Sequence, residues 1–292
     1  MPIKILLQST IVPTDDDWHI GRFSLLRNYL ASLRAADGSP LTVVEARNRA
    51  APPGTPDPVL SKLDQSDFDE LWLFAVDVGD GLTEQDCAGI SRFRRRGGGL
   101  MVTRDHHDLG SSVCSLGGVG PAHYFHSKNT DPDPSHRYND DPDNPDIQWP
   151  NFHSGANGDY QEIRAAGEPH ALLSDPASAD GLIHYLPAHP HEGGVGAPAS
   201  DTTARVIATG KSSITGKEFN LIVAFEPSEA GGPAVAESTF HHFADYNWDI
   251  RAGAPSFVTD RPGNQLAGFP RALQETQRYV RNLALWLAGR AV

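Results

Sequence analysis

The sequence lacks the features that mark several common classes of protein. It has only two cysteines among 292 residues, too few for a disulfide framework or a cysteine-rich zinc site. No apolar stretch approaches the length of about 18 residues that suggests a membrane span. The opening stretch, residues 1–7, is too short and too strand-like for a signal peptide. We therefore expect a cytoplasmic protein with no membrane partner.

Positive charge is also scarce. The chain has 24 Lys and Arg against 37 Asp and Glu, a formal net charge of −13. A nucleic-acid surface needs clustered Lys and Arg to displace counterions, so no nucleic-acid partner is expected. A small-molecule substrate is the expected partner, and a homo-oligomer stays open. What the sequence does have in quantity is 28 glycines and 23 prolines, which indicate long loops, and 13 histidines.

The first hundred residues alternate between strand and helix patterns. An amphipathic helix is predicted at 26–33, and Thr83 with Asp86 forms a capping box for a second helix that ends in arginines and glycines. Strand–helix–strand repetition with short connections implies a parallel sheet in an α/β fold. The apolar runs that predict its strands are residues 3–8, 41–46, 71–76 and 100–103.

The rest of the chain changes character. Residues 127–146 have almost no apolar side chain and four prolines, which predicts a long polar loop. Pro270 begins a final helix. We expect a single domain, residues 1–292, with a polar loop insertion at about 127–200. Strand patterns return at 182–186, 204–208, 219–225 and 234–240, and no helix separates the last three, so antiparallel or mixed additions to the sheet are predicted.

Titratable side chains follow the strand at residues 100–103. Ligands of an open α/β sheet bind beyond the carboxyl ends of its strands. We predict that His106 or His107 is a general base or metal ligand, that Asp105 orients it, and that Arg104 anchors an anion or oxyanion. The alternative is a solvated loop in which one histidine caps a backbone carbonyl.

A second pair of histidines follows the last predicted strand. His241 and His242 lie between two phenylalanines, after a strand that carries Glu237. Consecutive strand residues face opposite sides, so one histidine of the pair is expected in the cleft. Both are catalytic candidates, and Glu237 is a candidate for substrate binding. Two core histidines wedged among aromatic side chains are the alternative.

A third cluster, residues 149–160, mixes aromatic rings, amides and small residues. Amides and carboxylates can pair with hydroxyl groups while an aromatic ring covers an apolar face, which suits a sugar or another small polar ligand. The alternative is an ordered loop that closes on itself through asparagine side chains. The substrate-binding candidates here are Trp149, Asn151, His153, Asn157 and Asp159.

Several histidines near carboxylates are the ingredients of a Zn²⁺, Mn²⁺ or Fe²⁺ site. Residues 184–192 contain a His-x-His-Glu run that is plausible as metal ligation but matches no standard zinc signature. The aspartates of residues 131–146 lack the EF-hand pattern, and a solvated acidic flap is the favoured interpretation. The predicted ligands of one divalent metal are His106, His123, His126 and His242.

Three segments resemble the ThuA-like (trehalose-utilisation) family. In residues 93–106 a helix, a glycine-rich turn and a strand lead to a histidine, as in that family. Leu-Gly-Gly at 116–118 is followed by His123 and His126, and residues 234–242 are similar to the family's last strand, which also ends at a histidine. The resemblance covers roughly residues 1–126 and 204–290.

The resemblance implies a class I glutamine-amidotransferase-like, flavodoxin-like three-layer α/β/α sandwich. It also implies a histidine site for a carbohydrate-related or other small polar ligand. The charged Asp105–Asp108 run and the acidic flap depart from the family pattern. Glutaminase activity is not expected, because the strand ends in Thr103-Arg104-Asp105, where true amidotransferases have an elbow cysteine.

Two functions from different classes follow. The first is a hydrolase or lyase that acts on a small polar substrate. A sugar derivative is one substrate of this kind. The second is a non-catalytic small-molecule-binding or scaffold protein on the same fold. A cysteine hydrolase that uses Cys114 is a distant third, since Cys114 does not sit in a strand-to-helix elbow.

Overall fold

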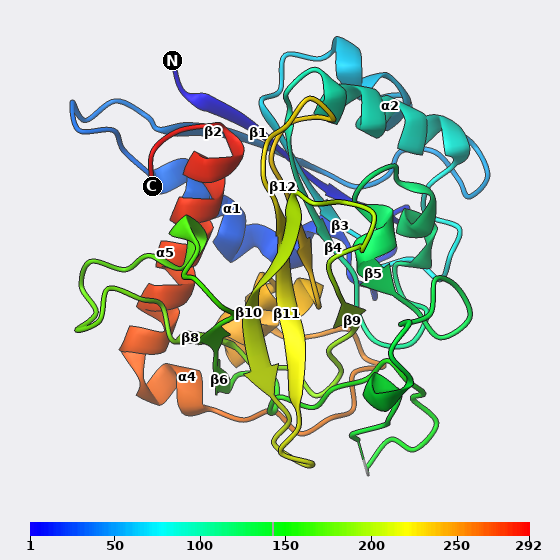
Figure 1. Ribbon diagram of the computed structural model, residues 1–292, viewed down its shortest axis with the longest axis vertical. Helices are drawn as coiled ribbons and strands as arrows, with labels where there is room; N and C mark the ends of the chain where they lie inside the picture. The colour runs from blue at the N-terminus through cyan, green and yellow to red at the C-terminus, as the bar shows by residue number, and fades with distance from the viewer. Residues whose placement is uncertain (142) are drawn as a thin grey trace.

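An eight-stranded mixed sheet forms the centre of the computed structural model, which describes residues 1–141 and 143–292 (Figure 1). Residue 142, in the predicted polar loop, lies outside the described residues. The strand order is β2-β1-β3-β4-β12-β11-β10-β7. The bounds are β1 Ile3–Ser9, β2 Thr42–Arg47, β3 Glu70–Phe74, β4 Gly99–Thr103, β7 Arg164–Ala165, β10 Ala204–Lys211, β11 Glu218–Phe225 and β12 Ala234–Glu237.

The sheet has a parallel half and an antiparallel half. Strands β2, β1, β3, β4 and β12 are parallel, whereas β11, β10 and β7 add to β12 in antiparallel fashion. The predicted mixed addition is therefore confirmed. Ser9 pairs with Phe74, Phe74 with Thr103, and Thr103 with Glu237. Because these four residues end their strands, the loops that follow them start from one edge of the sheet.

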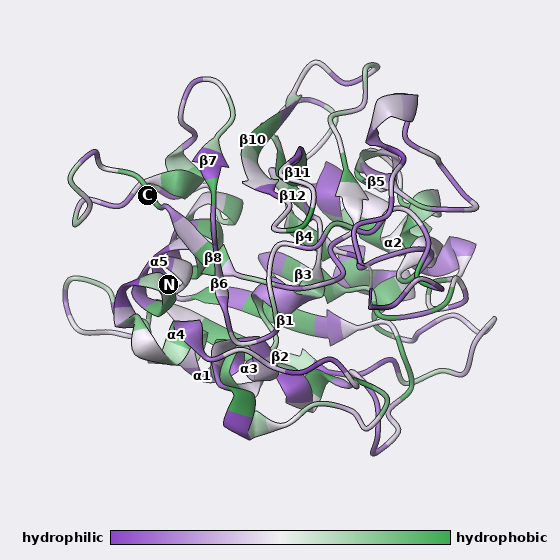
Figure 2. Ribbon diagram, turned by 90° about the horizontal axis from the view of Figure 1, so that it is seen from below, coloured by the Kyte–Doolittle hydropathy of each residue, from purple (hydrophilic) through white to green (hydrophobic). Residues whose placement is uncertain are grey.

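Helices cover both faces of the sheet. Alternate residues of β1 point to opposite sides, so Ile5 and Leu7 enter one hydrophobic core and Leu6 enters the other. Figure 2 shows the strands succeeding one another across the molecule, with α2 on one side and α1 and α5 on the other. The predicted three-layer α/β/α sandwich is confirmed. The longer helices are α1 Ser24–Ser32, α2 Glu84–Arg95 and α5 Pro270–Leu287.

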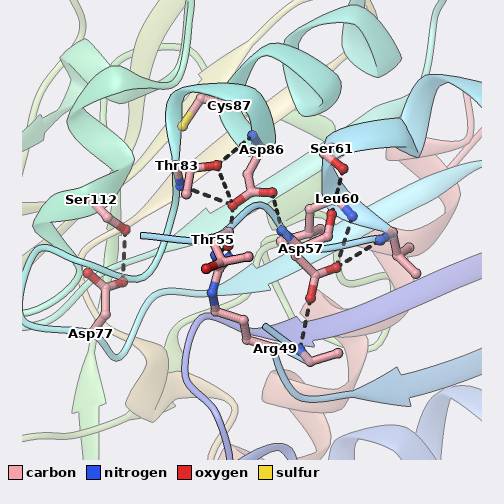
Figure 3. Close-up of polar contacts among 12 residues, drawn as sticks. Arg49, Thr55, Asp57, Leu60, Ser61, Asp77, Thr83, Asp86, Cys87 and Ser112 are labelled. Atoms are coloured by element: carbon pink, nitrogen blue, oxygen red, sulfur yellow. Dashed lines mark hydrogen bonds and ion pairs between the residues drawn. The ribbon is translucent and has the colours of Figure 1, made fainter. Parts of the chain in front are cut away.

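The N-terminus of α2 is held by buried polar contacts (Figure 3). The predicted capping box is present: Thr83 accepts from the amide of Asp86, and the Asp86 side chain accepts from the amide of Thr83. Asp86 also pairs with buried Arg49, whose Nη1 lies 2.9 Å from its Oδ2. Burial acts to raise the pKa of Asp57, but hydrogen bonds from Arg47 and from backbone amides outweigh it and lower that pKa to about 2. These contacts fix the layer that supports β3 and β4.

The insertion is not the continuous loop that its composition predicts. It contains β6 Tyr160–Glu162 and β8 Tyr185–Pro187, which pair with each other, and β9 Gly194–Val195, which pairs with β5 His123–Tyr124. Strand β7, also from the insertion, extends the central sheet. The strand predicted at 182–186 begins only at Tyr185. Short strand pairs therefore anchor the insertion at several points along its length.

The last predicted strand is shorter than expected. Strand β12 ends at Glu237 because Thr239 caps a 3-10 helix, η7 Phe240–His242, by accepting from the amide of His241. The described residues contain no helix with the length and apolar character needed to cross a bilayer. The remaining helices are α3 Asp245–Trp248, α4 Gln265–Gly268, η1 Ile20–Phe23, η2 Leu60–Gln65, η3 Ser111–Ser115, η4 Gly120–Ala122, η5 Pro134–His136, η6 Ala171–Leu173 and η8 Ile250–Ala252.

Candidate functional site

A cavity of about 400 Å³ opens where β3, β4 and β12 end. Its polar lining includes Asp105, His106, His189, His191, His241 and Asp260, and its apolar lining includes Trp18, Val76, Ile147, Phe240 and Phe257. A larger and more open groove of about 990 Å³ passes over α1 and α5, but none of its described lining residues is a histidine. Four histidines, by contrast, line the smaller cavity: His106, His189, His191 and His241.

Three buried side chains converge at the cavity. Asp105 follows β4, His241 lies in η7, and His189 comes from the segment between β8 and β9. One ligand atom from each lies within 4.8 Å of the other two. The imidazole rings of His189 and His241 stack with centroids 3.5 Å apart, and His189 Nε2 lies 3.6 Å from Asp105 Oδ1. Two imidazoles and one carboxylate thus face one point.

Two asparagines orient these imidazoles. His189 Nδ1 donates to Asn157 Oδ1 at 2.8 Å, and His241 Nδ1 donates to Asn247 Oδ1 at 2.7 Å. Asn247 Nδ2 donates in turn to Asn157 Oδ1 at 2.8 Å, which couples the two amides. An amide oxygen only accepts, so each ring carries its proton on Nδ1 and keeps a lone pair on Nε2. His189 Nε2 is buried without a hydrogen-bond partner.

The protonation states suit a cation. Burial lowers the pKa of His189 to about 4 and holds the pKa of His241 well below its usual value. Burial acts to raise the pKa of Asp105, but His189 and His106 outweigh it and hold that pKa well below its ordinary value. Asp105 also accepts from the hydroxyl of Thr239 at 2.7 Å. Neutral imidazoles beside an ionised carboxylate are what metal ligation requires.

A second group of ligand atoms lies in the same cavity region. Asp141, His191 and Asp260 each bring one ligand atom within 4.8 Å of the others. His191 Nδ1 lies 3.2 Å from Asp141 Oδ2, and His191 Nε2 lies 3.3 Å from Asp260 Oδ2. The His191 ring is 5.3 Å from that of His189, centroid to centroid. The two groups are therefore neighbours.

The structure brings three of the predicted catalytic residues to the cavity: Asp105, His106 and His241. His106 Nδ1 bonds Asp105 Oδ2 at 2.8 Å, the pairing expected from the sequence. Arg104 does not line the cavity. It is fully buried, donates to the carbonyl of His107 and lies 4.2 Å from the ring centroid of Phe125. Burial lowers its pKa to about 9, and the structure places this predicted anion anchor beneath the strand end instead of at the cavity.

The predicted metal ligands do not form one group. Only His106 lies at the cavity, whereas the rings of His107 and His126 pack on each other with centroids 4.7 Å apart. The structure thus places His107, a predicted catalytic residue, and His126 outside the cavity lining. His123 is fully buried, and burial together with Arg104 lowers its pKa to about 3. The predicted metal ligands belong to separate loops, and they therefore lie in different parts of the structure.

His242 and Glu237 belong to the core and not to the cavity. His242 Nδ1 lies 3.0 Å from Glu237 Oε2, and its Nε2 lies 3.5 Å from Glu192 Oε2. All three side chains are fully buried, and Tyr279 donates its hydroxyl to Glu237. The structure therefore places His242, predicted to be catalytic and a metal ligand, and Glu237, predicted to bind substrate, in the core, where their polar atoms are already engaged.

The substrate-binding residues predicted within 149–160 also lie outside the cavity lining. Trp149 Nε1 donates to the His136 carbonyl, and His153 bonds Ser213. Asp159 accepts from the backbone amides that begin α4, and Asn151 is fully buried. Trp149, His153 and Asp159 thus bond other groups of the chain, whereas neither amide atom of Asn151 has a hydrogen-bond partner among the described residues. Asn157 is also behind the cavity wall, where it orients His189.

Sequence reasoning did not place three residues of the insertion, Asp141, His189 and His191, among the site candidates. His189 and His191 belong to the His-x-His-Glu run, which is plausible as metal ligation but matches no standard zinc signature. Asp141 lies in the predicted solvated flap but is buried. Asp260 and Asn247 carry no sequence signal, because only folding brings them beside histidines far away in the chain.

Comparisons with solved structures identify the fold. A ThuA-like protein from Parabacteroides merdae superposes with a TM-score of 0.52 at 16% identity, over 100% of this chain and 92% of that one. The chain has the ThuA-like fold. Another ThuA-like protein, from Bacteroides uniformis, has a TM-score of 0.44 at 12% identity, over 96% of this chain and 91% of that one.

A glutaminase domain is also among the structures with some similarity to this chain. The glutaminase domain of Trypanosoma brucei CTPS has a TM-score of 0.46 at 11% identity, over 98% of this chain and 94% of that one. No family model matches the sequence, and no curated protein matches it either. The likeness therefore concerns the fold, and function has to be argued from the cavity.

Proposed function

We propose that the chain is a metal-dependent hydrolase or lyase that acts on a small polar, sugar-related substrate. The observation that carries the proposal is the convergence of Asp105, His189 and His241, with the remote nitrogen of each imidazole held by an asparagine. Two imidazoles and a carboxylate are a ligand set used for catalytic Zn²⁺ and non-haem Fe²⁺, which leave open positions for substrate or water.

Each residue at the cavity has its own role in the proposed reaction. A divalent cation in this position supplies Lewis acidity toward a substrate oxygen or a bound water. His106 holds its Nδ1 on Asp105 and lines the cavity, so its Nε2 is placed to accept or donate a proton. Asp105 therefore offers one carboxylate oxygen to His106 and the other to the cation. Thr239 Oγ1 donates to that second oxygen and fixes the carboxylate plane.

The cavity suits a small ligand with both polar and apolar faces. Its volume of about 400 Å³ lies within the range usual for small-molecule sites. Trp18, Phe240 and Phe257 provide aromatic walls, while the histidines and carboxylates provide the polar floor. A sugar ring presents hydroxyl groups on its edge and C–H groups on its face, and so matches both surfaces.

The thiol route has less support. Cys114 is half-buried, and burial raises the pKa of its thiol, which leaves it protonated near neutral pH. It does not line the cavity. The other cysteine, Cys87, is buried with a pKa raised to about 11. A nucleophilic cysteine requires the opposite shift.

The test begins with untagged protein. We expect it to copurify with a divalent metal, and we expect a chelator to lower its thermal unfolding temperature. His189→Ala and His241→Ala should each lower the bound metal at least tenfold and the turnover of a panel of glycosides, acetylated sugars and sugar lactones about a thousandfold. His184→Ala removes a partly exposed histidine outside the cavity and is the matched control.

The outcomes separate the two functional classes. Absence of bound metal, together with no thermal shift on adding Zn²⁺, Mn²⁺ or Fe²⁺, would remove the metal-dependent mechanism. Metal and sugar binding without turnover of any member of the panel would instead support a non-catalytic small-molecule-binding protein.

A further inference from the structure

We propose that Asp141, His191 and Asp260 form a second divalent-cation site beside the first. The inference goes beyond the proposed function and holds whether or not the first site is catalytic. The three residues come from separate segments: the acidic flap, the insertion between β8 and β9, and the loop that precedes α4. Their ligand atoms nevertheless lie within 4.8 Å of one another.

Charge balance at this place favours a cation. The Asp141 and Asp260 carboxylates both face the single imidazole of His191. Within the described ranges 1–141 and 143–292, neither carboxylate forms an ion pair with Lys or Arg. Asn144 Nδ2 donates to Asp141 Oδ2 at 3.0 Å and to Asp260 Oδ1 at 2.9 Å, which draws the two like charges together. Such proximity is costly unless a cation neutralises it.

An unpartnered nitrogen points into the same group. His191 is only 5% exposed, and its Nδ1 has no hydrogen-bond partner, although Asp141 Oδ2 lies 3.2 Å away. The ring nitrogen and the carboxylate oxygen thus lie close together without a hydrogen bond between them. Two atoms that bind the same cation are arranged in this way. Two carboxylates and one imidazole complete three positions of a coordination shell, and water can take the others.

The donor sets of the two sites differ. The first site has two imidazole nitrogens and one carboxylate, whereas the second has one imidazole and two carboxylates. Oxygen-rich sets favour Mn²⁺ and other hard cations, while imidazole-rich sets suit Zn²⁺ and Fe²⁺. The His191 ring lies 5.1 Å from the His106 ring and 5.3 Å from the His189 ring, so both cations would border one cavity.

A second cation would also close the cavity. Asp141 belongs to the flap and Asp260 to the loop that carries Phe257 and Val258 at the cavity lining. Joining the two carboxylates through one cation ties both segments over the floor formed by His189 and His241. The acidic composition of the flap then has a function, namely to supply a ligand at the end of a polar segment.

Mn²⁺ titration followed by electron paramagnetic resonance tests the inference directly. Metal-stripped, untagged protein should bind two Mn²⁺ per chain. The double variant D141N/D260N, which keeps the size of both side chains, should bind one, as should the double variant H189A/H241A. Asp146→Asn changes an exposed acidic residue of the same flap and should leave two bound ions.

The possible results distinguish the two sites. If D141N/D260N binds as many Mn²⁺ ions as the wild type with equal affinity, the second site is overturned, and the first is unaffected. If H189A/H241A loses no ion while D141N/D260N loses one, the second site stands and the first fails. A wild-type chain that binds at most one Mn²⁺ at saturation also overturns the second site, even if a variant does not fold.

A second readout follows from the closure of the flap. Mn²⁺ should slow limited proteolysis within residues 127–146 at least threefold in the wild type and in H189A/H241A. The same ion should give no protection in His191→Gln, which removes the imidazole and leaves both aspartates in place. Protection that persists in His191→Gln would contradict the proposed ligand set.

Discussion

His241 and His242 are neighbours in the chain but have opposite chemistry. His241 faces the cavity and an asparagine, and burial holds its pKa well below the usual value. His242 faces the core between Glu237 and Glu192; burial acts to lower its pKa, but the two carboxylates outweigh it and raise that pKa to about 9. The same residue type is thus neutral at one position and a buried cation at the next.

The difference shows that burial keeps a histidine neutral unless carboxylate partners outweigh it. Both imidazoles are at most 2% exposed. Burial acts to lower the pKa of both rings. At His241 the hydrogen bond to Asn247 acts to raise the pKa but does not outweigh burial, whereas at His242 two carboxylates stabilise the imidazolium and outweigh it. The 3-10 helix η7 turns the two side chains to different sides, so one strand end supplies both a functional group and a structural ion pair.

Replacing each histidine by glutamine should separate these roles most strongly. His242→Gln leaves two buried carboxylates near each other without a cation and should lower the free energy of unfolding by about 3–5 kcal/mol. In metal-free protein His241→Gln should cost only about 1 kcal/mol of stability, while it abolishes the proposed metal binding. Urea unfolding of the two variants measures the contrast, and equal losses of stability would contradict it.

The pH dependence of stability should differ in sign at the two positions. The folded pKa of His242, about 9, exceeds its unfolded value of about 6.5, so its contribution is present below that value and is lost as pH rises through 9. The loss should be on the order of 3 kcal/mol. The lowered pKa of His241 acts oppositely and weakens the fold as pH falls below about 6.5.

Urea midpoints between pH 5 and pH 10 measure this dependence. His242→Gln is the control, because it should flatten the alkaline limb of the profile and leave the acid limb in place. An unchanged alkaline limb in that variant would show that His242 is not the cation responsible.

The smallest effect should come from the asparagine that orients His241. Asn247→Ala removes the acceptor of His241 Nδ1 and the donor to Asn157, and should weaken metal binding about 10- to 100-fold with the fold retained. Competition with a chromogenic chelator measures the affinity. Asn28→Ala, at an exposed position of α1, is the control and should change nothing. An unchanged affinity in Asn247→Ala would assign this amide to packing alone.

Part of the fold follows directly from the sequence. The strands near residues 3–8, 71–76 and 100–103 are apolar because helices cover both faces of the sheet. The capping box at Thr83 and Asp86 is local chemistry, and local chemistry is readable from sequence. The strand predicted to 240 failed for a local reason as well, since the Thr239 side chain accepts from the amide of His241 and ends the extended backbone.

Part of the cavity follows too. Asp105, His106 and His241 are predictable because they follow strands that end at one edge of a sheet. The position of His189 is not predictable in this way, because it lies in an insertion whose path across that edge depends on short strand pairs of a few residues. The same reasoning that found His241 chose its neighbour His242 as well, since sequence alone does not reveal which residue a turn rotates inward.

By itself the sequence determined the layered α/β architecture, the acidic and histidine-rich character of the molecule, and the edge of the sheet where chemistry gathers. Only the tertiary structure decided which imidazoles meet a carboxylate, which meet an amide, and which are locked between glutamates. The physical reason is the separation along the chain over which each interaction acts. Hydrophobic periodicity and helix capping involve residues that are close in the sequence. Asp105, His189 and His241, by contrast, come from distant segments and meet only when the chain has folded around the cavity.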